Sequence, residues 1–247
     1  MNGMNKHLYY FALGFFTVNL FWALGYLLTG TPVIPSPWTV YAQTGKLLQN
    51  NILLHIALSL KRIGLGLLLS LAVGIPVGIL MAYSKIAGAV LRPFVYFTYP
   101  IPKTALLPIA MFLWGMHDGS KVAILFLIIV FQAMISVRDG IESIDPAYYL
   151  VTVSAGASRM QIIRHVTLPA VLPALMTSLR ISIATAVAVL FFAEGYGTRY
   201  GMGYYILDAW SRLDYAGMYA GILVISVVGY WLFASIDMLS KRLYRWR

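Results

Sequence analysis

The sequence predicts an all-α membrane protein with about six transmembrane helices. Of its 247 residues, 60% are hydrophobic and only 11% are charged, and the mean hydropathy is +0.80. A soluble domain carries about 25% charged residues. The apolar residues also form long runs, and about 20 in a row span the hydrocarbon of a bilayer. Together these observations exclude a soluble globular protein.

Six apolar segments follow one another along the chain. They cover residues 8–28, 63–83, 94–114, 122–137, 170–193 and 216–239, with an amphipathic lead-in over 52–62. The first could be a secretory signal, but it is longer than a signal core and no small-residue cleavage site follows it, so we expect a retained helix. The proline-rich residues 29–50 are expected to form an exposed connection. We therefore divide the chain into residues 1–50, the first helix with an external connection, and 51–247, a five-helix core.

Small and helix-breaking residues mark two of these segments. The second contains four glycines, whose small size lets helix backbones approach closely in lipid: Gly64, Gly66, Gly74 and Gly78. Prolines interrupt the third segment. Such breaks are tolerated only where other protein or a watery cavity satisfies the freed backbone groups.

The basic residues predict the orientation. With the N-terminus inside, ten Lys and Arg residues fall in inner segments and four in outer ones, as the positive-inside rule requires. The inner set is Lys6, Lys85, Arg92, Arg138, Arg159, Arg164, Lys241, Arg242, Arg245 and Arg247, and the outer set is Lys46, Lys121, Arg199 and Arg212. Lys61 and Arg62 lie near a boundary and are not counted. We expect both termini to be cytoplasmic.

The longest polar stretch, residues 138–168, predicts two short helices on the inner side. Asp145 and Pro146 suit the start of the first helix, because aspartate is a good N-cap and proline a good first residue. Gly156 suits a left-handed turn that ends it. Ser158 and Gln161 form a capping box for a second helix, which is expected to end at 168–169. From these patterns alone, the segment is either a helix resting on lipid headgroups or a docking element for a soluble partner.

The same stretch resembles the cytoplasmic loop of bacterial ABC importer permeases. The matching residues are Gly156, Ala157, Ser158, Arg159, Val166, Leu168 and Pro169. In that family the loop opens with a Glu-Ala-Ala triplet, whose positions are here Leu150, Val151 and Thr152. Across residues 50–245 further motifs resemble the nitrate, taurine and aliphatic-sulfonate branch: 100–103 (PIPK), 106–108 (LLP), 114–115 (WG), 119–121 (GSK), 179–181 (LRI), 193–194 (AE) and 201–204 (GMGY).

This resemblance implies a type I ABC importer permease fold with a cytoplasmic coupling helix, in a bacterial inner membrane. It implies a homodimer of permeases, an external substrate-binding protein, and two ATPase subunits that bind ATP and Mg²⁺. The implied ATPase-coupling residues are Gly156, Ala157, Ser158, Arg159, Ile162, Ile163, Leu168 and Pro169. The implied cargo is a small anion, with a sulfonate such as taurine first and nitrate second, and a thiamine pyrimidine precursor as the alternative.

Several chemistries are absent from the sequence. No Gly-x4-Gly-Lys-[Ser/Thr] motif occurs to cradle nucleotide phosphates, and no His-Glu-x-x-His motif occurs to hold zinc. The chain has no cysteine, and thus no thiolate site or disulfide. Ser158 and His165 could share a helix face, but no buried carboxylate is expected to orient the histidine. We therefore expect no enzymatic activity and no cofactor or metal in this chain. The basic residues form no patch for nucleic acid.

Four residues are candidates for the translocation pathway: Pro102, Lys103, Arg180 and Glu194. Charged residues inside spans are costly and are often functional. Lys103 is expected near the cytoplasmic mouth, anchored by snorkelling. Arg180 is either tied to a carbonyl or carboxylate, or attracts an anion. Glu194 is either an interfacial carboxylate or supports a hinge or gate.

A secondary transporter is the competing function from another class. It needs an internal site for energy coupling, such as paired acids at the midplane, and usually internal repeats. The predicted spans contain neither an acidic pair nor an evident inverted repeat. The pattern therefore favours the ATP-driven importer.

Overall fold

The computed structural model describes residues 3–243, apart from the side chains of residues 3–8, 10–12 and 44. Over this range the chain is helical and has no strand. The elements are α1 Gly3–Thr29, α2 Pro37–Ala42, α3 Thr44–Gln49, α4 Ile52–Tyr83, α5 Lys85–Thr98, the 3₁₀ turn η1 Lys103–Leu106, α6 Leu107–Trp114, α7 Asp118–Glu142, α8 Pro146–Ser154, α9 Arg159–Ile162, the π-turn η2 Ile163–Thr167, α10 Leu168–Glu194, α11 Met202–Ser211 and α12 Tyr215–Leu243.

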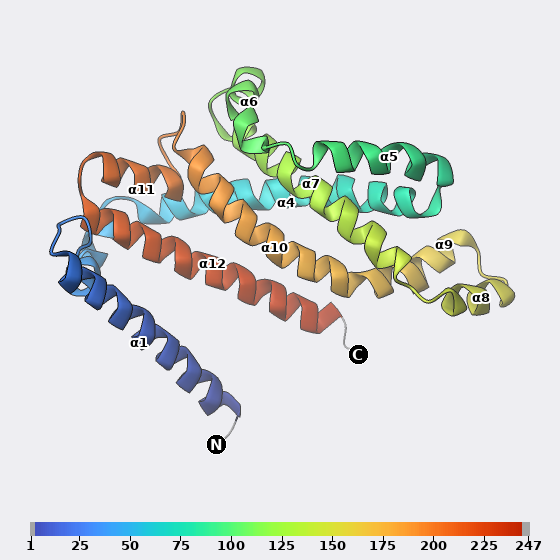
Figure 1. The fold of residues 1–247 in the computed structure, drawn as a ribbon, viewed down its shortest axis with the longest axis horizontal. Helices are drawn as coiled ribbons and strands as arrows, with labels where there is room; N and C mark the ends of the chain where they lie inside the picture. The colour runs from blue at the N-terminus through green and yellow to red at the C-terminus, as the bar shows by residue number, and fades with distance from the viewer. Residues whose placement is uncertain (1–2, 244–247) are drawn as a thin grey trace.

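Among the described residues, four helices are long and apolar enough to cross a membrane. They are α4, α7, the continuous helix Arg159–Glu194 and α12. Two shorter apolar helices, Leu13–Thr29 and Lys103–Trp114, fall in the first and third predicted segments. In Figure 1, α8 and α9 lie together at one end of the long helices, and α11 lies at the other. We call these the α9 end and the α11 end.

The third apolar segment is not one helix. The chain leaves α5 after Thr98 and re-forms a helix only from Lys103 onward. Pro100 and Pro102 lie in this gap, and proline can neither donate a backbone hydrogen bond nor continue a helix without a clash. The predicted span over 94–114 is therefore two short helical pieces joined by a turn.

Close packing of α4 against α7 forms the centre of the fold. A Cβ atom added at Gly66 would lie 2.7 Å from the Cβ of Leu125, and one at Gly74 would lie 2.6 Å from the Cβ of Ala133. Gly78 is equally crowded, whereas Gly64 has nothing within 4 Å. Three of the four predicted glycines thus let the two backbones approach, and Gly64 does not take part in this contact.

The connection over residues 29–50 differs from the exposed segment expected. It forms α2 and α3, because Ser36 caps α2 by accepting a bond from the N–H of Thr39 and Pro37 stands in its first turn. Val40 and Leu47 are buried in a cluster that includes residues of α11 and α12. The apolar residues that follow Pro37 are what the prediction missed.

Candidate functional site

The loop between α7 and α10 adopts the two-helix form that its capping residues predict. The carboxylate of Asp145 accepts a bond from the N–H of Ala147 at the start of α8. Gly156 has φ +79°, the left-handed conformation expected of it. Ser158 and Gln161 form the reciprocal capping box at the start of α9. The sequence therefore predicted the caps of both short helices and the turn between them.

The junction with α10 differs from the expected one. The second short helix was expected to end at 168–169, but it runs through the π-turn η2 into α10, giving one helix from Arg159 to Glu194. Pro169 lies just after this π-turn. A proline ring crowds the carbonyl four residues before it, and a widened turn relieves that crowding. The loop is therefore joined rigidly to α10.

The apolar residues of the loop differ in their exposure. Ile162 and Ile163 are half-buried against the chain itself. A cavity of about 290 Å³ lies within the loop, and Ile162 helps to line it. Five large apolar side chains of the loop are more than half exposed: Tyr148, Leu150, Val151, Val153 and Met160. Two of these stand at the positions of the missing Glu-Ala-Ala triplet, so the outward surface is apolar there.

Lys103 begins the 3₁₀ turn η1, between α5 and α6. Its ammonium lies 5.1 Å from the ring centre of Phe131, a residue in the middle of α7. It donates to the carbonyls of Thr98 and Tyr99 at 2.6 and 2.5 Å. Both carbonyls lie at the break after α5 that contains Pro102, and that of Thr98 also accepts a bond from the N–H of Ile101 at 3.2 Å. Lys103 therefore caps a broken helix inside the bundle.

Arg180 and Asp237 form an ion pair between α10 and α12. Both side chains are about half exposed in the single chain. Arg180 thus has the neighbouring carboxylate that one of its two expected roles requires. Sequence reasoning did not pair the two residues, because they are far apart in the chain.

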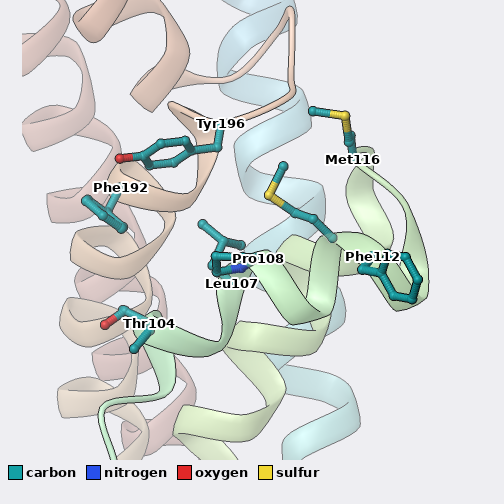
Figure 2. A pocket seen from close by; sticks show the side chains of 9 residues that line it. Thr104, Leu107, Pro108, Phe112, Met116, Phe192 and Tyr196 are labelled. Carbon is teal, nitrogen blue, oxygen red and sulfur yellow. The ribbon is translucent and has the colours of Figure 1, made fainter.

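An open apolar cavity of about 780 Å³ lies between η1–α6 and the end of α10 (Figure 2). Its lining contains no charged side chain: Thr104, Ala105, Leu107, Pro108, Met111, Phe112, Met116, Phe192 and Tyr196. A second cavity, of about 410 Å³, includes Lys103, Gln132 and Thr185 in its lining and shares Thr104 with the first. The two form a candidate route beside the broken segment.

Glu194 is fully buried at the α11 end. Its side chain is 1% exposed. Oε1 accepts a bond from Arg62 at 2.5 Å, and Oε2 accepts one from the N–H of Gly203 at 2.8 Å. The hydroxyl of Ser59 lies within bonding distance of both oxygens, at 2.8 and 2.9 Å. These donors satisfy both carboxylate oxygens.

The partners of Glu194 on α4 were missed in the sequence, where Arg62 was set aside as a boundary residue. A signal was available. His55, Ser59 and Arg62 are spaced four and three residues apart, which places them on one face of a helix. Three polar residues on one face of an otherwise apolar span indicate a polar contact inside the bundle.

No cluster of three or more histidine or acidic side chains able to hold a metal ion occurs in the described part of the chain.

Residues 74–245 match the family model of the binding-protein-dependent transport system inner membrane component. The chain belongs to this family. It is 33% identical to the taurine transport system permease protein TauC of Escherichia coli, over 78% of this chain and 70% of that protein. It is 30% identical to the putative aliphatic sulfonates transport permease protein SsuC of Bacillus subtilis, over 87% and 78%. It is 29% identical to the formylaminopyrimidine transport permease protein ThiX of Halalkalibacterium halodurans, over 95% and 94%.

Solved structures show the same fold. A chain of a bacterial alginate ABC transporter, in complex with its periplasmic protein, gives a TM-score of 0.69 at 18% identity, over 97% of this chain and 96% of that one. A chain of the MetNI methionine ABC transporter gives 0.68 at 19% identity, over 82% and 98%. The type I importer permease fold and the function of a transport permease, which the sequence predicted, are confirmed. Membership of a binding-protein-dependent transport family also favours the importer over the secondary transporter.

Proposed function

We propose that this permease takes up a small sulfonate, in the first place one such as taurine, using ATP hydrolysed by a separate subunit. The observation that carries the ATP-driven part is the α8–α9 loop, which presents an apolar surface and is continuous with α10. Two copies of the chain would form the pathway, two ATPase subunits would bind ATP and Mg²⁺, and an external binding protein would deliver the cargo. Both termini and the α9 end would then be cytoplasmic.

Chemical complementarity defines the ATPase contact more closely. The exposed side chains of Leu150, Val151 and Met160 would enter a groove of the ATPase, because burial of apolar surface stabilises such a contact. Ile162 and Ile163 would hold the loop together from inside rather than touch the partner. Movement of the ATPase would then pull on α10 through the helix that begins at Arg159.

Two relatives support a sulfonate cargo, since the names of TauC and SsuC state taurine and aliphatic sulfonates. Nitrate has no such support among these relatives. A neutral pyrimidine is the second candidate, for two reasons. ThiX matches along 95% of the chain, and the larger cavity offers Phe112, Phe192 and Tyr196 but no charged group. Aromatic rings suit a flat heterocycle better than an inorganic anion.

Gly156→Val tests the ATPase contact. The left-handed backbone at Gly156 disfavours valine by about 1–3 kcal/mol, and no atom lies within 4 Å to add a clash. We expect a membrane-inserted permease that loses its ATPase subunit on purification or hydrolyses ATP without transport. Gly30→Val is the matched control, because Gly30 also has positive φ and nothing within 4 Å, but follows α1. Normal transport by the Gly156 variant would remove the loop from the proposal.

A further inference from the structure

A buried ionic cluster connects three long helices at the α11 end. Arg62 of α4 donates to Glu194 of α10 and, through Nε at 2.8 Å, to Asp118 of α7. Lys61 also contacts Asp118, at 2.9 Å. Lys121 of α7 is fully buried and donates to the carbonyl of Met116 at 2.6 Å. α4, α7 and α10 therefore each contribute charged side chains to the cluster.

The turn between α10 and α11 is fastened to the same cluster. Arg62 donates to the carbonyl of Tyr200 at 2.9 Å, and the N–H of Met202 donates to Ser59 at 2.8 Å. The imidazole Nδ1 of His55 lies 2.8 Å from the carbonyl oxygen and 3.1 Å from the amide nitrogen of Gly201. The backbone of residues 200–203 is thus held by side chains of α4 and by Glu194.

The cluster also positions the walls of the larger cavity. Phe192 and Tyr196 lie on either side of Glu194 in the sequence, and Met116 carries the carbonyl that Lys121 binds. The two walls also pack together next to the cavity. A Cβ atom added at Gly197, which follows Tyr196, would lie 2.9 Å from the side chain of Met116. Any displacement of the end of α10 therefore displaces the cavity walls with it.

We propose that Glu194 is a positioning residue that locks the end of α10 and residues 195–203 to α4 and α7 throughout the transport cycle. Breaking a buried ion pair leaves an uncompensated charge in a low-dielectric interior, which is strongly unfavourable. The lock therefore stays closed while the α9 end moves. Arg159–Glu194 is one helix. When the ATPase moves α9, α4 and the cavity walls therefore move with α10 as a rigid body. The transmission of motion from the ATPase rests on the proposed function, whereas the attachment of α10 to α4 and α7 through Glu194 does not.

A nitroxide label tests the lock directly. The chain has no cysteine, and Arg199 is exposed within the fastened turn, so Arg199→Cys provides a single labelling site. The labelled permease is reconstituted with its own ATPase and binding protein. We expect the same spectrum without nucleotide and with ATP and vanadate. A gain in label mobility in either state would show that the turn releases during the cycle and would overturn the proposal.

Variants of Glu194 then test what the lock does. In Glu194→Ala we expect a mobile label and a fall in transport per ATP hydrolysed of about two- to thirtyfold, the range for residues that couple distant sites. Glu194→Gln keeps an acceptor for Gly203 but loses the charge facing Arg62, so an intermediate effect is expected. Asp208→Asn is the control, since it removes an exposed ion pair with Arg212 at the same end.

The ratio of transport to hydrolysis separates coupling from stability. A merely unstable variant lowers both rates together and leaves their ratio unchanged. An unchanged ratio in a folded Glu194→Gln protein with a mobile label would overturn the coupling role. If the native chain binds no ATPase, the proposed function fails, but the label still reports on the lock in the permease alone. The two failures are therefore distinguishable.

Discussion

Gly201→Ala should destabilise the permease, because Gly201 combines an unusual backbone conformation with direct contact to Glu194. Its backbone has φ 139° and ψ 157°, a region that only glycine adopts readily. A Cβ added there would lie 2.5 Å from both carboxylate oxygens of Glu194. The backbone strain costs about 1–3 kcal/mol. Crowding in a packed interior adds about 1–3 kcal/mol.

Gly115→Ala is the matched control for that variant. Gly115 has φ 78° and ψ 169°, in the same glycine-favouring region, but nothing lies within 4 Å of its added Cβ. It should lose only the backbone contribution, about 1–3 kcal/mol. The free energy of unfolding is measured by titrating the purified permease in mild detergent with sodium dodecyl sulfate. Equal losses in the two variants would refute the reasoning, because they would show that contact with Glu194 adds nothing.

Three further predictions follow from packing, hydrogen bonding and topology. Gly74→Ala should lower the free energy of unfolding by about 1–3 kcal/mol in the same titration, because the new methyl group crowds α7. Gly64→Ala should leave it unchanged or raise it by up to about 1 kcal/mol. The opposite order would contradict the α4–α7 contact. Lys103→Met should cost about 1–3 kcal/mol, because the backbone carbonyls that Lys103 binds lose their ammonium donor. It should not raise the substrate concentration for half-maximal transport, and a large rise in that concentration would indicate that Lys103 belongs to an anion site. A cysteine at Met160 should resist an impermeant maleimide added to intact cells while one at Arg199 reacts, and the reverse would overturn the orientation.

Local patterns predicted the α8–α9 loop well, because each feature depends on neighbouring residues. The caps at Asp145 and Ser158 and the left-handed turn at Gly156 involve partners only a few residues away. Periodicity and hydropathy likewise located the long helices. The π-turn before Pro169 was missed, because a proline can start a helix or be accommodated within one, and the sequence alone does not distinguish these.

Long-range pairing was not predictable from the sequence. Arg62 and Glu194 are separated by 132 residues, and the residues next to each in the sequence do not indicate that the two pair. The glycines of the 201–204 motif were noted as a resemblance, but their physical reason appears only in the fold. There, Gly201 lies against Glu194, and a Cβ at Gly203 would lie 2.8 Å from the Cα of Phe191.

Substrate-stimulated ATP hydrolysis tests the central claim most directly. The permease is reconstituted in liposomes with its proposed ATPase and binding-protein partners, and hydrolysis is measured with taurine, a longer alkanesulfonate, nitrate or a formylaminopyrimidine. The account predicts that a sulfonate stimulates hydrolysis and is accumulated in the lumen. Stimulation by the pyrimidine alone would contradict the sulfonate assignment and leave the ATP-driven permease intact. Accumulation of cargo without ATP or any ATPase would contradict the account as a whole.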